Sequence, residues 1–132
     1  MDAQLQFGLP RKFELPMPPP LNSLYRFYKG KLYMVTEARR YKWMVSAELK
    51  RIKPPKFDDS AKISMRLVAH PSNGTESRRD ADGYLKIVLD SFQDGNLFTD
   101  DNQIKHIEVV IMPPDNSLAE GFIEIEFAEI LN

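Results

Sequence analysis

The sequence predicts one small α/β domain, in which α-helices pack on a mixed β-sheet. Its 132 residues suffice for one domain and are too few for two of ordinary size. Stretches with apolar residues at every second position, typical of strands, are interspersed with two stretches of helical periodicity. A hydrophobic share of 42% suits a folded core. We expect residues 1–132 to form this single domain, with 1–12 as a candidate flexible N-terminus.

The sequence of the first third of the chain indicates a rigid link followed by a hairpin. Four of the five residues 16–20 are prolines, which fix φ and remove backbone donors, so an extended link within the domain is expected there. In residues 25–35, aromatic side chains stand on both sides of Lys29-Gly30. This pattern predicts a β-hairpin with its turn at the glycine.

A helix is predicted over residues 36–52. Thr36 is a suitable N-cap, and two prolines at 54–55 stop the helix. Apolar side chains recur at four-residue spacing and predict a buried stripe of Tyr41, Val45 and Leu49. Trp43 is expected beside this stripe, in the core.

The second half predicts strands around another helix. Residues 62–68 alternate polar and apolar, which indicates a half-buried strand followed by a loop at 70–75. Helical spacing covers residues 80–92, and Asp94-Gly95-Asn96 is expected to end that helix at the glycine. Two further strands are predicted at 104–112 and 121–127.

Composition restricts the possible chemistry. There is no cysteine and only two histidines, His70 and His106, so disulfides, thiolate zinc sites and a cysteine nucleophile are excluded. A metal would be held by oxygen ligands, which favour magnesium, manganese or calcium. No secretion signal or bilayer-spanning stretch is evident in the sequence, so we expect a soluble, cytoplasmic protein without a membrane partner.

Charge is divided unevenly along the chain. Residues 1–56 hold twelve Lys or Arg and four Asp or Glu, whereas residues 57–132 hold six against fifteen. Ordinary solvated surface would explain this division. One surface that meets a polyanion, with another that gathers carboxylates around a cation, is the functional alternative to this simpler explanation.

Two acidic stretches carry the candidate chemistry. Asp80 and Asp82 lie two residues apart at the mouth of the second predicted helix, and Asp101 opens the next strand. Phosphodiester hydrolysis needs a metal ion to activate water and neutralise phosphate charge, and converging carboxylates can hold one. Lys86 falls one helical turn after Asp82, where it could stabilise the leaving oxygen. Taken singly, each acid would also serve as a helix cap or turn residue.

Order and spacing of these residues form a specific pattern. It consists of Arg79-Asp80-Ala81-Asp82, Lys86 and Asp100-Asp101-Asn102-Gln103, preceded by a proline-led entry at 18–26. This pattern resembles the RusA family of crossover junction endodeoxyribonucleases, the RusA-type Holliday junction resolvases, over roughly residues 13–127.

The resemblance implies a RusA-like fold and a magnesium-dependent endonuclease, with manganese as an alternative metal. Such enzymes resolve four-way DNA junctions by paired symmetric nicks in DNA recombination and repair, act as homodimers and often travel with phages and prophages. Carried over by position, Asp80, Asp82 and Asp101 are the metal-binding catalytic aspartates and Lys86 is the catalytic lysine. The residues expected to contact DNA phosphates are Arg26, Lys29, Lys31, Arg39, Arg40, Lys42, Arg78 and Arg79.

One departure keeps other functions open. Gly83 stands where the family usually has asparagine, which removes a side chain that could brace a ligand or a phosphate. A junction-binding protein that is weak or inactive in cutting is therefore an alternative. Independently of this glycine, a nuclease acting on other branched DNA is a second alternative. The third alternative is an adaptor domain in which the carboxylates are only caps and turns.

Overall fold

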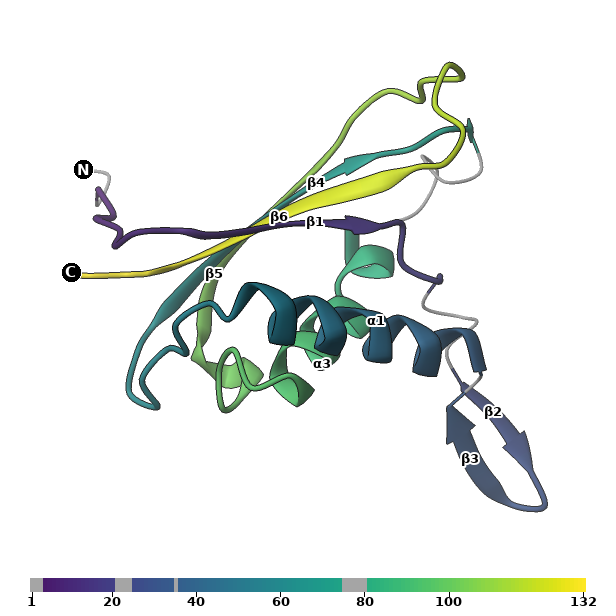
Figure 1. Ribbon diagram of the computed structural model, residues 1–132, viewed down its shortest axis with the longest axis horizontal. Coiled ribbons are helices and arrows are strands. Elements are labelled where there is room, and N and C mark those ends of the chain that lie inside the picture. Colours follow the sequence, from purple (N-terminus) through teal and green to yellow (C-terminus); the bar gives the residue numbers. More distant parts are fainter. Residues whose placement is uncertain (1–3, 21–24, 35, 75–80) are drawn as a thin grey trace.

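A four-stranded mixed sheet carries two α-helices on one face (Figure 1). The computed structural model describes residues 4–20, 25–34, 36–74 and 81–132, and in 25–28 and 32–34 it describes the backbone only. The strand order across the sheet is β1-β6-β4-β5. Strand β4 pairs parallel with β5 and antiparallel with β6, and β6 pairs antiparallel with β1. The bounds are β1 (Arg11–Pro16), β4 (Ile63–His70), β5 (Ile104–Ile111) and β6 (Phe122–Glu129).

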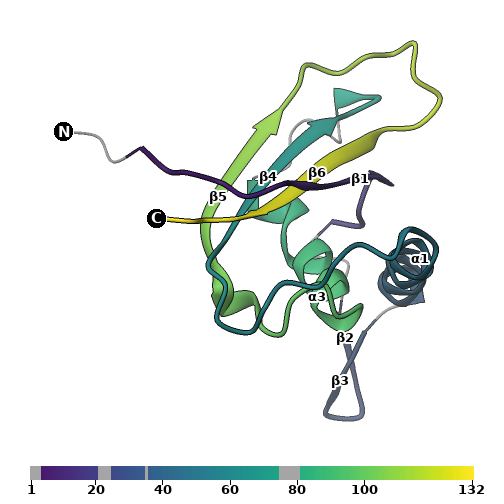
Figure 2. The same ribbon diagram turned by 60° about the vertical axis from the view of Figure 1, so that its left-hand side comes forward.

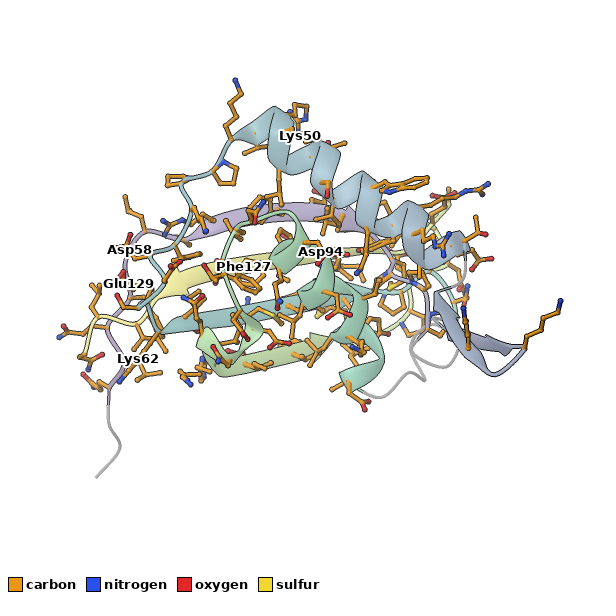
Figure 3. The ribbon with its side chains drawn as sticks, turned by 90° about the horizontal axis from the view of Figure 1, so that it is seen from below. Lys50, Asp58, Lys62, Asp94, Phe127 and Glu129 are labelled. Atoms are coloured by element: carbon orange, nitrogen blue, oxygen red, sulfur yellow. The ribbon has the colours of Figure 1, made fainter. Side chains whose placement is uncertain are left out.

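Both helices cover the same side of this sheet, which confirms the predicted α/β domain (Figure 2). Helix α1 spans Thr36–Ile52 and helix α3 spans Lys86–Asp94. The side chains of alternate strand residues form the core beneath them, because successive side chains of a strand point to opposite faces. From β6, Phe127 projects toward the helices and meets Phe92 of α3, with ring centroids 4.8 Å apart (Figure 3).

A two-stranded hairpin extends beyond the start of α1, away from the sheet (Figure 1). It consists of β2 (Tyr25–Tyr28) and β3 (Lys31–Met34), as the aromatic pattern predicted. Lys29 and Gly30 both have positive φ, at 50° and 74°. Two consecutive left-handed residues give a turn whose twist matches that of the paired strands.

Helix α1 has the predicted bounds but a different assignment for its tryptophan. Tyr41, Val45 and Leu49 are buried as expected, together with Ala38. Trp43, expected in the core, is 69% exposed, so that prediction was wrong. Position 43 lies two residues from 41 and from 45, a rotation of about 200° that turns its side chain away from the buried stripe.

Other elements also differ from the sequence prediction, among them β6, which runs to Glu129, two residues past the predicted end. Strand β1 was missed because only Phe13 and Leu15 mark its buried side and Pro16 follows. The expected helix over 80–92 is divided: a 3-10 turn, η2 (Ala81–Tyr84), precedes α3. Strand β4 continues to His70, two residues past the predicted end. No helix in the described ranges has the length and apolar character that crossing a bilayer requires.

The glycine after α3 serves packing instead of a left-handed turn. Gly95 has φ −79°, and the positive φ of 65° belongs to Asn96. A Cβ on Gly95 would lie 2.3 Å from Cδ1 of Leu49 on α1. The missing side chain therefore lets the end of α3 approach α1 closely.

Gln103 ties the segment before β5 to the loop before β4. It lies in the 3-10 turn η3 (Asp101–Gln103) and is 6% exposed. Its Oε1 accepts hydrogen bonds from the backbone N–H groups of Thr99 (3.0 Å) and Asp100 (3.2 Å). Its Nε2 donates to the carbonyl oxygens of Asp58 (2.9 Å) and Ala61 (3.1 Å). All four hydrogen bonds hold backbone, so this side chain fixes the position of η3.

We predict that Gln103→Glu destabilises the protein by about 1–3 kcal/mol at neutral pH, because a carboxylate replaces a donor that faces the carbonyl oxygens of Asp58 and Ala61. Burial raises the pKa of the introduced carboxyl, so the loss should shrink as the pH falls and the group takes up a proton. Urea unfolding at several pH values measures this. The same change at exposed Gln6 is the control and should be neutral at every pH; an equal loss at both positions would contradict the role of Gln103.

Candidate active site

Two 3-10 turns, η2 and η3, lie beside helix α3 and form the candidate site with it. Contacts join α3 to both 3-10 turns, and η2 also contacts β5. In η2, Tyr84 is completely buried and anchors the turn, whereas Asp82 is exposed. The predicted site residue Asp82 therefore has a fixed backbone and a side chain open to solvent.

Lys86 is the first residue of α3 and forms an ion pair with Asp90, with Nζ 3.2 Å from Oδ2. The two side chains are 47% and 23% exposed, and the pair has the i,i+4 spacing that aligns side chains on a helix. Asp82 lies in the preceding 3-10 turn, so Asp82 and Lys86 do not belong to one α-helix as the sequence had predicted.

Asp101 lies beside α3. Its backbone N–H donates to Oε1 of Gln93, at 3.0 Å. Burial raises the pKa of the Asp101 carboxyl, and the carboxylates of Asp100 and Asp90 raise it further, the former also through a side-chain hydrogen bond. Lys86 acts in the opposite direction. Asp101 and Lys86, which lie fifteen positions apart in the sequence, are thus close enough to influence each other.

We call Asp90, Asp100, Asp101 and Lys86 the α3 cluster. The charges that shift the Asp101 pKa within the described part of the chain do not include Asp82. Asp80 lies outside the described residues. The structure therefore brings together two of the four predicted catalytic residues and places a third on the neighbouring turn.

The donor chemistry of this region fits a hard divalent cation. Its side chains offer carboxylate oxygens, and the pKa of Asp101 is raised first by burial and then by the neighbouring carboxylates of Asp100 and Asp90, whose repulsion a cation would relieve. Among residues 4–20, 25–34, 36–74 and 81–132, no three Asp, Glu or His side chains form a ready-made metal cluster. The predicted trio needs Asp80, which the structure does not describe, to be complete.

Neither histidine belongs to this region. His106 Nδ1 lies 2.8 Å from Ser64 Oγ. His70 pairs with Glu124, at 2.5 Å, and its ring stacks on Phe122. These residues occupy the strand positions that alternate with the buried ones, so they lie on the face of the sheet opposite the helices.

The predicted DNA-contacting residues have different surroundings. Lys29 and Lys31 are exposed at the hairpin, and Arg39 and Arg40 are exposed on α1. Lys42 instead binds Asp94, with Nζ 2.7 Å from Oδ2, and joins α1 to the end of α3, where Asp94 lies between the two helices (Figure 3). The Arg26 side chain, Arg78 and Arg79 lie outside the described residues.

Two residues of the site were missed by sequence reasoning. Asp90 had a detectable signal, the i,i+4 spacing from Lys86. Gln93 had none, because its partner is a backbone N–H in a segment that only the fold brings near.

Comparison with known proteins places the chain in a family. The family model described as "Endodeoxyribonuclease RusA" matches residues 16–126. A crossover junction endodeoxyribonuclease from Enterobacteria phage HK97 is 28% identical over 117 residues, covering 87% of this chain and 95% of that protein. The enzyme of the same name from Escherichia coli K12 is 26% identical over 118 residues, covering 89% and 93%. The match spans both acidic stretches and the helix between them, and the chain therefore belongs to the RusA family of endodeoxyribonucleases.

Proposed function

We propose that this protein is a metal-dependent endonuclease that resolves four-way DNA junctions by paired nicks. Family membership supports the reaction class, and the observation that carries the proposal is the convergence of Asp101 with Lys86. Phosphodiester hydrolysis requires oxygens that hold a metal ion and a positive group that stabilises developing charge. The carboxylate and the ammonium group are suited to these two needs.

Asp80, Asp82 and Asp101 would hold the metal, with magnesium as the expected ion and manganese as the alternative. When bound, such an ion would lower the pKa of a coordinated water and neutralise charge on the phosphate. The ammonium group of Lys86 stabilises negative charge on the phosphate and leaving oxygen. Asp90 holds that ammonium at 3.2 Å and acts as a positioning residue.

Exposed basic groups on the hairpin and α1 bind the DNA backbone. Lys29, Lys31, Arg39 and Arg40 are exposed, and Arg26, Arg78 and Arg79 are assigned the same role by their sequence positions. Phosphate contacts of this kind give affinity without reading sequence. A homodimer would present two such sites to the two-fold substrate, so that each subunit cuts one strand.

Cleavage of a labelled four-way junction tests the proposal. We expect paired nicks with magnesium, none with EDTA, and a loss on the order of 100-fold or more in Asp101→Asn, which removes a metal-binding charge. Asp115→Asn, the same change at an exposed loop position, should cut normally. Tight binding without nicks in any divalent metal would favour the non-catalytic alternative, and Gly83→Asn would then be tested for restored cutting.

The Lys86–Asp90 pair can be separated into catalytic and positioning parts. We predict that Lys86→Gln lowers kcat on the order of 100-fold, because the charge is lost. Asp90→Asn should lower kcat roughly ten-fold, because the ammonium keeps its charge and loses its anchor. Both variants should retain junction Kd and Tm. A fall in Tm that matches the fall in activity would show that Asp90 is only structural.

Salt dependence tests the hairpin. Removing both of its exposed lysines, as Lys29→Ala with Lys31→Ala, should weaken junction binding and reduce the slope of log K against log salt by about two, roughly one for each lost phosphate contact. Lys62→Ala with Lys105→Ala is the matched control, since both lysines are exposed and lie away from the hairpin. An unchanged slope in the hairpin variant would remove the hairpin from the DNA-binding surface.

A further inference from the structure

Helix α1 presents an aromatic side chain to solvent that the mechanism does not use. Trp43 is the only tryptophan in the chain and is 69% exposed. The buried side of α1 is complete without it, since Ala38, Tyr41, Val45 and Leu49 already pack on the core. Leaving so large an apolar group in water is unfavourable, and such positions often mark contact surfaces.

The neighbours of Trp43 on the helix surface are basic. One turn before it lie Arg39 and Arg40, and two turns after it lies Lys50, all exposed. We call these four residues, with Ala47 between them, the Trp43 face. Among the described residues neither arginine nor Lys50 has an ion-pair partner.

No carboxylate lies on this face. The two acids of α1 are Glu37 and Glu48, about 120–140° around the helix from Trp43. Glu48 is occupied by Arg51, at 2.8 Å. The Trp43 face therefore combines one flat aromatic ring with uncompensated positive charge.

This combination fits a nucleobase flanked by phosphates better than it fits a protein. Aromatic rings stack on bases whatever their sequence, and cations beside the ring neutralise the backbone. A protein interface of ordinary size needs about 800 Å² on each partner with an apolar centre. The Trp43 face offers only one large apolar side chain, and its remaining residues are mostly cations.

We propose that Trp43 stacks on an unpaired nucleobase at the branch of a DNA junction, while Arg39, Arg40 and Lys50 bind the adjoining phosphates. The inference rests on the proposed function and extends it. Linear duplex DNA has no free base face along its length, so the stacking contact forms only at a branch or a single-stranded segment. Trp43 is thereby a residue that distinguishes branched from linear DNA.

Because Trp43 is the only tryptophan, intrinsic fluorescence reports on this residue alone. In EDTA, which prevents cutting, a four-way junction with unpaired bases at its centre should quench the emission and shield it from acrylamide. A linear duplex of equal length should bind at low salt with little quenching. Equal emission changes with both DNAs, or none with either, would overturn the proposal.

Substitution provides the second test. Trp43→Ala should weaken junction binding roughly ten-fold and leave duplex binding unchanged, whereas Trp43→Phe should retain most of the affinity. The matched control is Leu9→Ala, which removes an exposed apolar side chain elsewhere; Leu9 is 87% exposed. Normal junction binding by Trp43→Ala would overturn the proposal.

The outcomes also separate this inference from the proposed function. If the wild-type protein cuts junctions while Trp43→Ala binds them normally, only the stacking role fails. If the wild-type protein neither binds nor cuts branched DNA, both fail. If Trp43→Ala changes the oligomeric state on gel filtration and leaves DNA binding intact, the Trp43 face is a subunit contact and the stacking role is refuted.

Discussion

The position of the candidate site depends on the buried amide of Gln103. Its oxygen and nitrogen together hold four backbone groups from two segments, Thr99-Asp100 and Asp58–Ala61. Without it, η3 would be an exposed turn whose backbone could move relative to α3. Fixing that turn places Asp101 beside Lys86 in spite of the electrostatic cost of gathering carboxylates there. The Asp-Asp-x-Gln spacing thus joins two roles, a ligand carboxylate and the group that holds its backbone in place.

Strong periodicity made most of the fold predictable. The four-residue spacing in α1 puts its apolar side chains on one side only if the segment is a helix, and the alternation in β4 does so only if the segment is a strand. Strand β1 has two buried apolar residues, which are too few to form a recognisable pattern. It pairs with β6, which is far away in the sequence, so its partner becomes visible only in the fold. Trp43 was misjudged because composition places tryptophan inside, whereas helix geometry at position 43 turns it outward.

The candidate site was predictable to the extent that its chemistry follows from order in the chain. Asp101 and Lys86 could be paired because the motif fixes their separation, and the fold brings them together. The contribution of Asp90 depended on where α3 begins. An α-helix starting at residue 80 would place both Asp82 and Asp90 four residues from Lys86, whereas the observed 3-10 turn leaves only Asp90 at that spacing within the helix. Helix boundaries are weakly encoded when a 3-10 turn precedes them, so this partner could not be assigned from sequence with the same force.

The division of charge along the chain acquires a spatial meaning in the fold. The outer face of the sheet carries Glu108, Glu124 and Glu126; Arg66 pairs with Glu108, and the ring of His70 contacts Glu124. A polyanion such as DNA would therefore find little attraction on the outer face of the sheet. Exposed cations lie instead on the hairpin and on the outward side of α1, in the helical layer that also holds the α3 cluster. Long-range electrostatics would therefore orient DNA toward the helical side before any close contact forms. The near-zero net charge of −1 therefore conceals an uneven placement of charge, with glutamates on the outer face of the sheet and exposed cations on the hairpin and α1.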